Sequence, residues 1–131
     1  MTKARVTVIE DDTDLREAIC VMLRYEGYEA SGFSNAREAI HRLEGGHQSD
    51  VILLDLMMPV MNGWEFCEYR AEATTLARVP VIVITARRAV TAPPGVSDVL
   101  LKPFDADELY DAINKVLAGS PVTADRQRQE Q

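Results

Sequence analysis

Short apolar runs of strand length alternate along the chain with segments in which apolar residues recur at helical spacing. The runs cover residues 6–9, 28–33, 51–54, 81–84 and 99–101. Val51–Leu54 is apolar at every position, which is typical of a strand buried on both faces of a parallel sheet. After the first run, Leu15, Ile19 and Leu23 repeat at the spacing of one helix face. Repeated strand–helix units predict an α/β fold, with a parallel sheet, right-handed crossovers and helices on both faces.

Two segments depart from this regular pattern. The run 28–33 is weaker than the others because it contains Gly32, which we expect to interrupt the strand. The connection Ala86–Asp98 contains Pro93-Pro94-Gly95, and a proline inside a helix removes a backbone donor and clashes with the preceding turn. We therefore expect the fourth helix of the fold to be shortened or missing.

The composition suits one domain without a nucleic-acid surface. The chain has 131 residues, of which 47% are hydrophobic, so it can bury a substantial core. We expect the domain to cover residues 1–120 and the polar segment 121–131 to form a flexible tail. The formal net charge of −7 argues against binding to nucleic acids or anionic membranes. The apolar runs are too short to span a bilayer, and Cys20 and Cys67 have no metal or redox spacing, so we expect a cytoplasmic protein.

Polar residues that can carry chemistry stand where four of the predicted strands end. The first strand is followed by Glu10, Asp11 and Asp12, the third by Asp55, the fourth by Thr85 and the fifth by Lys102. Because the carboxyl ends of parallel strands form the ligand crevice of such a sheet, we expect these side chains to converge. Clustered carboxylates repel one another, and Mg²⁺, which prefers oxygen ligands, removes that repulsion. A lysine and a hydroxyl can stabilise a phosphoryl group, and a central carboxylate can accept it as an acyl phosphate.

Taken singly, each of these residues has an ordinary interpretation. An acid after a strand often caps the next helix, a lysine is usually solvated, and a threonine is a normal strand residue. Their joint occurrence at successive strand ends favours the functional interpretation, because convergent groups in one crevice are typical of a site.

Four segments carry a resemblance to a known family. They are Val8–Asp12 (VIEDD), Asp50–Gly63 (DVILLDLMMPVMNG), Val81–Ala86 (VIVITA) and Leu100–Phe104 (LLKPF). With them the chain resembles the response-regulator receiver domain of bacterial two-component signalling, in a stand-alone, chemotaxis-regulator-like form with an atypical fourth helix. The resemblance implies a flavodoxin-like, doubly wound parallel sheet with the strand order 2-1-3-4-5.

The resemblance also implies a metal site. Asp55 matches the phosphoacceptor of the family. Glu10 and Asp11 match the acidic pair that holds Mg²⁺ together with Asp55, with Asp11 as a direct ligand and Glu10 acting through water. Met57 matches the position whose backbone carbonyl completes the metal site.

Thr85 and Lys102 match the hydroxyl and the lysine that contact the phosphoryl group in the family. The resemblance implies that a phosphohistidine on a sensor histidine kinase or a histidine phosphotransfer protein donates this group, and that acetyl phosphate can replace it. It implies a signalling switch that catalyses its own phosphorylation rather than an enzyme. A downstream protein target or a second copy in a homodimer would then sense the switch.

Two features set the chain apart from its family. Val99 stands where receivers usually carry Tyr or Phe, so an aromatic ring cannot swing toward Thr85. Together with the altered fourth helix, this indicates a rebuilt output route. Met57 and Arg87 offer no acid or amide to orient a water molecule, so we expect slow autodephosphorylation.

Two alternatives remain open at the level of sequence. Val99 and the prolines are compatible with an interaction module that keeps the receiver shape but does not depend on phosphorylation. A phosphatase of the haloacid-dehalogenase type also uses a strand-end aspartate and Mg²⁺. That class needs a second aspartate two positions after the nucleophile, where this chain has Met57.

Overall fold

A parallel sheet of five strands forms the centre of the molecule. The computed structural model describes residues 3–74, 76–86 and 91–119. The strands are β1 (Arg5–Ile9), β2 (Glu29–Phe33), β3 (Val51–Asp55), β4 (Val81–Thr85) and β5 (Asp98–Leu101). They lie in the order β2-β1-β3-β4-β5, and every neighbouring pair is parallel. The predicted flavodoxin-like, doubly wound fold is therefore confirmed.

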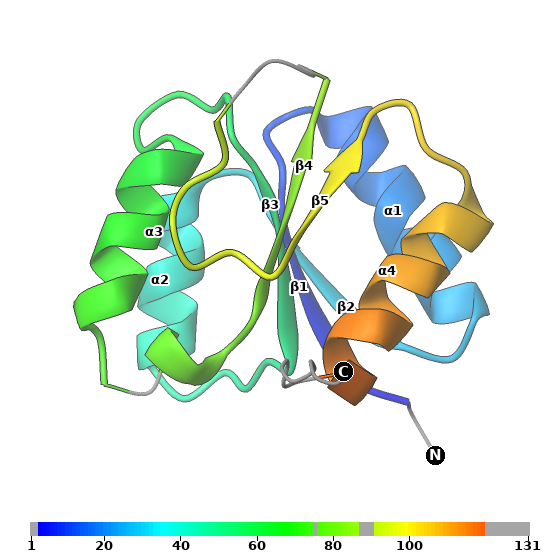
Figure 1. The fold of residues 1–131 in the computed structure, drawn as a ribbon, viewed down its shortest axis with the longest axis horizontal. Helices are drawn as coiled ribbons and strands as arrows, with labels where there is room; N and C mark the ends of the chain where they lie inside the picture. Colours follow the sequence, from blue (N-terminus) through cyan, green and yellow to red (C-terminus); the bar gives the residue numbers. More distant parts are fainter. Residues whose placement is uncertain (1–2, 75, 87–90, 120–131) are drawn as a thin grey trace.

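Helices cover both faces of this sheet (Figure 1). They are α1 (Thr13–Tyr25), α2 (Ala36–Glu44), α3 (Gly63–Glu72) and α4 (Ala106–Gly119), with a short 3₁₀ turn, η1 (Leu76–Arg78). The helices α2 and α3 lie on one face and α1 and α4 on the other. Among the described residues, no helix is long and apolar enough to cross a membrane. The predicted tail, 121–131, lies outside the described residues.

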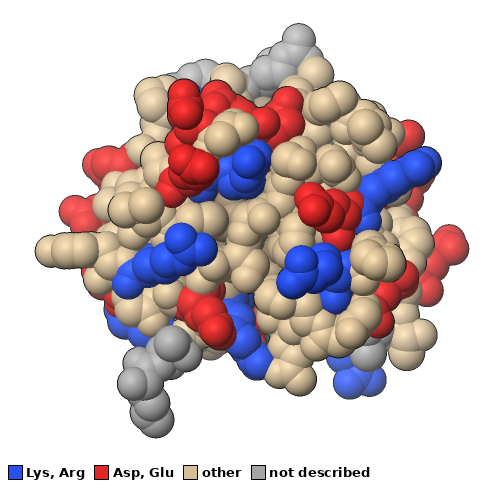
Figure 2. Space-filling view, turned by 180° about the vertical axis from the view of Figure 1, so that it is seen from behind, with Lys and Arg blue, Asp and Glu red and all other residues tan. Residues whose placement is uncertain are grey.

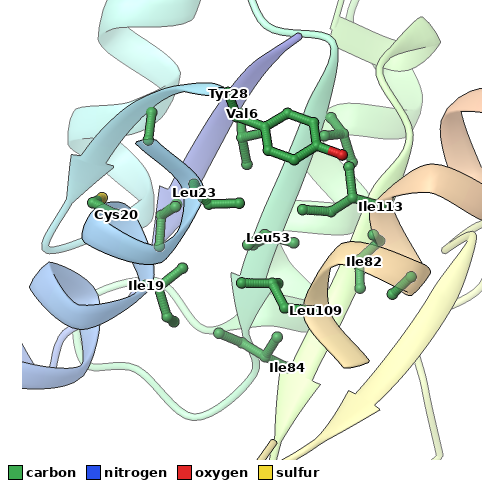
Figure 3. Close-up of a cluster of buried hydrophobic side chains, with 14 residues drawn as sticks. Val6, Ile19, Cys20, Leu23, Tyr28, Leu53, Ile82, Ile84, Leu109 and Ile113 are labelled. Carbon is green, nitrogen blue, oxygen red and sulfur yellow. The ribbon is translucent and has the colours of Figure 1, made fainter. Parts of the chain in front are cut away.

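The core consists of two apolar layers, one on each face of the sheet. Strand β3 is buried at all its positions and supplies both layers, because alternate side chains point to opposite faces. Leu53 packs with Ile19 of α1 and Ile113 of α4, and Figure 3 shows these side chains pointing toward one another. On the other face, Leu54 packs with Phe66 of α3. This double burial explains why β3 has no polar residue before its last position.

The prediction that Gly32 interrupts the second strand was wrong. Strand β2 runs through Gly32, which pairs with Val8 of β1. Gly32 has a low propensity for strands, but the hydrogen bonds to the central strand β1 compensate for it. Tertiary context, rather than local propensity, therefore determines the conformation of this segment.

The connection between β4 and β5 forms no helix within its described residues, as the prolines predicted. Residues 87–90 of this connection lie outside the described residues. The segment 91–97 packs instead against α3: the indole N–H of Trp64 donates to the backbone carbonyl of Thr91 (3.2 Å). Pro93 is buried, and Val96 packs against the same apolar layer as Trp64. Within the described residues, irregular chain with a turn at Pro94 and Gly95 therefore covers this part of the sheet.

Candidate functional site

The acidic residues predicted from the sequence meet at the carboxyl ends of β1 and β3. Ile9 pairs with Leu54, so the residues that follow these two positions, Glu10 and Asp55, emerge at the same level of the sheet. A carboxylate oxygen from each of Glu10, Asp11 and Asp55 lies within 4.8 Å of the others. Figure 2 shows acidic side chains gathered at the upper end of the molecule, toward which the strands point in Figure 1.

Burial makes the negative charges of this cluster unfavourable. Glu10 is 1% exposed and Asp55 is 4% exposed, whereas Asp11 lies at the surface. Carboxylates that are held together away from water repel one another more strongly than solvated ones. A positive charge is therefore required at this position, and the chain provides one in Lys102.

Lys102 bridges the two buried acids. It directly follows β5, and its backbone N–H donates to the carbonyl of Thr85 (2.8 Å), which fixes it beside the end of β4. Its Nζ lies 2.9 Å from Oε1 of Glu10 and 3.6 Å from Oδ1 of Asp55. Burial lowers the pKa of Lys102, but the bond to Glu10 and the charge of Asp55 outweigh this effect and leave the pKa raised.

The surroundings of Asp55 disfavour its negative charge. Burial is the largest cause, and the negative charge of Glu10 adds to it, so the pKa of Asp55 rises from an ordinary 3.8 to about 7. The charge of Lys102 and the backbone N–H of Met57, which donates to Oδ1 of Asp55 (3.3 Å), act in the opposite direction. A carboxyl group in a cleft whose pKa lies near neutral pH is characteristic of functional sites.

The remaining predicted residues line the same cleft. Thr85 ends β4, is 2% exposed and pairs with Leu101, the residue before Lys102. Met57 contributes backbone to the cleft while its side chain points to solvent, 51% exposed. The cleft has a volume of about 410 Å³ and is lined by Glu10, Asp11, Asp12, Asp55, Met57, Thr85, Ala86 and Lys102. The structure thus brings together all the site residues predicted from the sequence.

Asp12 has a different task from its acidic neighbours. Its side chain accepts the N–H of Leu15 (3.2 Å) and caps α1. Its own N–H donates to Oε2 of Glu10 (3.1 Å) and holds that carboxylate in place. Sequence reasoning considered Asp12 as a helix cap but missed this backbone contact, because a backbone donor leaves no signal in residue type.

The loop from β3 to α3 depends on a close approach at Gly63. Its N–H donates to the carbonyl of Leu56 (2.9 Å), and a Cβ atom at this position would lie 2.8 Å from Cα of Leu56. Asn62 caps α3 in a reciprocal arrangement with Glu65. Helix α3 is thereby seated against the residue that follows Asp55, which fixes the backbone of the cleft.

Val99 lies on β5 beside Val83 and is 40% exposed. The position at which the family usually carries an aromatic ring is therefore partly open to solvent in this chain. Arg87, the other residue expected to influence dephosphorylation, lies outside the described residues.

Comparison with known proteins identifies the family. The family model of the response regulator receiver domain matches residues 6–114, which include the whole cleft. The chain belongs to the response-regulator receiver family. Domains of this family are the receivers of two-component response regulators, and they interact with sensor histidine kinases.

Individual relatives agree with this assignment. The sensory transduction protein RegX3 of Mycolicibacterium smegmatis is 36% identical over 118 residues, which cover 86% of this chain and 50% of that protein. This chain therefore spans about half the length of that relative.

Solved structures show the same receiver architecture. The receiver domain of the sensor histidine kinase PA1611 from Pseudomonas aeruginosa has a TM-score of 0.81 and 26% identity, and the match covers 90% of this chain and 100% of that domain. It was solved with a magnesium ion coordinated in its active site cleft. The response regulator TrrA from Thermotoga maritima, solved with Mg²⁺ and BeF, has a TM-score of 0.78 and 27% identity, covering 88% of this chain and 100% of that one.

Proposed function

We propose that this receiver is a phosphoacceptor of a two-component phosphorelay, in which Asp55 accepts a phosphoryl group from a phosphohistidine in a Mg²⁺-dependent reaction. One observation carries the proposal: Asp55 lies buried among two acids, a lysine and a hydroxyl at the carboxyl ends of four parallel strands. This donor set fits phosphoryl transfer, which depends on positioning and on stabilising negative charge.

The acidic cluster fits a magnesium ion. Three carboxylates offer oxygen ligands within 4.8 Å of one another, and one of them, Asp11, is open to solvent. We propose that Asp11 and Asp55 bind the metal directly, that Glu10 binds through water and that the carbonyl of Met57 completes the set. When bound, Mg²⁺ would neutralise charge on the phosphoryl oxygens and on the cluster. The magnesium sites of the PA1611 receiver and TrrA support this assignment.

The chemical step then follows from the chain's own residues. A carboxylate oxygen of Asp55 attacks phosphorus in line with the phosphohistidine nitrogen. The new P–O bond forms as the P–N bond breaks, and the imidazole leaves with the electron pair and takes up a proton. Lys102 moves its charge from Glu10 toward the phosphoryl oxygens, and the hydroxyl of Thr85 donates to one of them. The product is an acyl phosphate on Asp55.

We further propose that the phosphoryl group acts as a switch rather than as a step in the turnover of an external substrate. The donor would be a sensor histidine kinase or a histidine phosphotransfer protein. The added charge would alter contacts with a downstream protein or a second copy of the chain. Dephosphorylation would be slow, because Met57 places no acid or amide side chain at the cleft.

Intact-mass spectrometry tests the proposal. The protein is incubated with acetyl phosphate, with and without Mg²⁺, and we expect the mass of one phosphoryl group to be added only when Mg²⁺ is present. Asp55→Asn should abolish this addition. Asp12→Asn is the matched control, because it changes an acid of the same cleft while asparagine keeps the cap of α1. Labelling of Asp55→Asn at the wild-type rate would overturn the assignment.

A further inference from the structure

Arg16 reaches from α1 to the end of β1. Its Nη1 donates to the backbone carbonyl of Glu10 (2.8 Å), and its Nη2 lies 3.5 Å from the hydroxyl oxygen of Thr13. The backbone N–H of Glu10 donates to the carbonyl of Phe33 on β2 (3.1 Å). Both backbone groups of Glu10 are therefore held, one by the neighbouring strand and the other by the guanidinium of Arg16.

Gly32 makes room for this contact. A Cβ atom on Gly32 would lie 3.1 Å from Cγ and 3.2 Å from Cδ of Arg16, which is tighter than ordinary packing. The absence of a side chain on β2 therefore lets the stem of Arg16 cross the strand toward Glu10. This explains a glycine inside a strand, where its conformational freedom and lack of packing are otherwise unfavourable.

We propose that Arg16, seated on Gly32, is a positioning residue that sets Glu10 for metal binding; this inference rests on the proposed function. The carboxylate of Glu10 is already fixed by Nζ of Lys102 (2.9 Å) and by the N–H of Asp12 (3.1 Å). A shift of the Glu10 backbone would move that carboxylate relative to Asp55. Arg16 prevents the shift, and it acts through the backbone of Glu10 rather than by touching the metal.

The chemistry of the side chain favours arginine at this place. A guanidinium presents a rigid fork of donors and can reach the carbonyl of Glu10 and the hydroxyl of Thr13 together. A lysine has the same charge but offers a compact head on a flexible stem. Arg16→Lys therefore changes the geometry while keeping the electrostatic repulsion between residue 16 and the metal ion constant.

The test compares Arg16→Lys with Arg24→Lys. Arg24 lies on the same helix and makes the same kind of bond, from Nη2 to the carbonyl of Ala30 on β2 (2.8 Å), but Ala30, unlike Glu10, is not a residue of the cleft. The dissociation constant for Mg²⁺ is obtained from the rise of Tm with MgCl₂ concentration at pH 8. We expect Arg16→Lys to weaken Mg²⁺ binding about tenfold, as is usual for residues that orient metal ligands. Arg24→Lys should bind Mg²⁺ as the wild type does.

Gly32→Val provides an independent variant. Valine favours strands, so the fold should be retained, but its side chain would displace the stem of Arg16 and would also press on Sγ of Cys20, 3.3 Å from the added Cβ atom. We expect weaker Mg²⁺ binding in this variant as well. In the double variant Arg16→Lys/Gly32→Val, the loss of Mg²⁺ binding free energy should be smaller than the sum of the losses in the two single variants, because both substitutions act through one contact.

The outcomes separate the inference from the proposed function. If the wild type binds Mg²⁺ and both Arg16→Lys and Gly32→Val bind it equally well, the positioning role is wrong and the proposed function stands. If the wild type itself shows no Mg²⁺-dependent rise in Tm, the metal site of the proposed function fails, and the inference fails with it. If Arg16→Lys lowered Tm but left the dissociation constant for Mg²⁺ unchanged, Arg16 would have a purely structural role and the inference would be wrong.

Discussion

Nζ of Lys102 lies 2.9 Å from Oε1 of Glu10. The same nitrogen lies farther, 3.6 Å, from Oδ1 of Asp55. At rest the lysine is therefore held mainly by Glu10. Asp55 keeps a weaker contact with the lysine, as the proposed role of its carboxylate as phosphoacceptor requires.

Lys102→Ala should weaken both the fold and the labelling reaction. Glu10 would lose the charge that compensates its burial, so we expect the free energy of unfolding to fall by roughly 2–4 kcal/mol at neutral pH. The fold should persist, with slower labelling by acetyl phosphate. Chemical denaturation and intact-mass kinetics measure the two effects. Lys115→Ala, an exposed lysine of α4, is the control, and a similar loss there would contradict the assigned role.

Asp55→Asn should stabilise the metal-free protein at pH 8. Asparagine has nearly the same shape as aspartate but removes a negative charge that burial and Glu10 disfavour. We expect a gain on the order of 2 kcal/mol at pH 8, measured by urea denaturation in EDTA. Millimolar Mg²⁺ should stabilise the wild type and have a much smaller effect on the variant. A loss of stability in EDTA would contradict the view that Asp55 is electrostatically strained.

The raised pKa of Asp55 sets a pH dependence. The stabilisation that comes from protonating Asp55 in the folded state is fully present below pH 3.8 and is lost as the pH rises through about 7. The same proton competes with Mg²⁺. Between pH 8 and pH 6 the apparent affinity for Mg²⁺ should therefore fall by about tenfold. Tm titrations with MgCl₂ at both pH values measure this change, and an affinity independent of pH would contradict the combination of a raised pKa of Asp55 and its role as a metal ligand.

Gly63→Ala should disturb the base of the cleft. The added methyl group would lie 2.5 Å from Cδ2 and 2.8 Å from Cα of Leu56, so the start of α3 would have to move. We expect a loss of roughly 1–3 kcal/mol in the free energy of unfolding, as is typical of overpacking. Gly119→Ala is the control, because no atom lies within 4 Å of the added group there. If Gly63→Ala and Gly119→Ala were equally stable, the backbone at Gly63 would have room for a methyl group, contrary to the contact distances with Leu56.

Sequence patterns predicted most of the fold because the central strands are buried on both faces. Every position of Val51–Leu54 and Val81–Ile84 has to be apolar, and such runs are easily distinguished from helices with one polar face. The convergence of Glu10, Asp55 and Lys102 followed from the geometry of parallel strands. Pro93 and Pro94 likewise predicted the absence of a regular helix in the described part of the β4–β5 connection.

Other features had no sequence signal. The burial of Glu10 could not be predicted, because acids at strand ends are more often exposed helix caps. Gly32 was misinterpreted as a break in the strand. A glycine is needed there because the stem of Arg16, which belongs to α1, lies against it, and this contact cannot be read from the strand's own sequence. The contact of Trp64 with Thr91 joins segments far apart in the sequence, and its acceptor is a backbone carbonyl, which any residue offers.

Locating the acyl phosphate tests the central claim most directly. The wild-type protein is labelled with acetyl phosphate and Mg²⁺ and reduced with borohydride, which converts a phosphorylated aspartate to homoserine. The modified residue is then identified by peptide mass spectrometry. We expect homoserine at position 55 and at no other acid of the cleft. Homoserine at Asp11 or Asp12, or an unmodified Asp55 in labelled protein, would contradict the role assigned to Asp55.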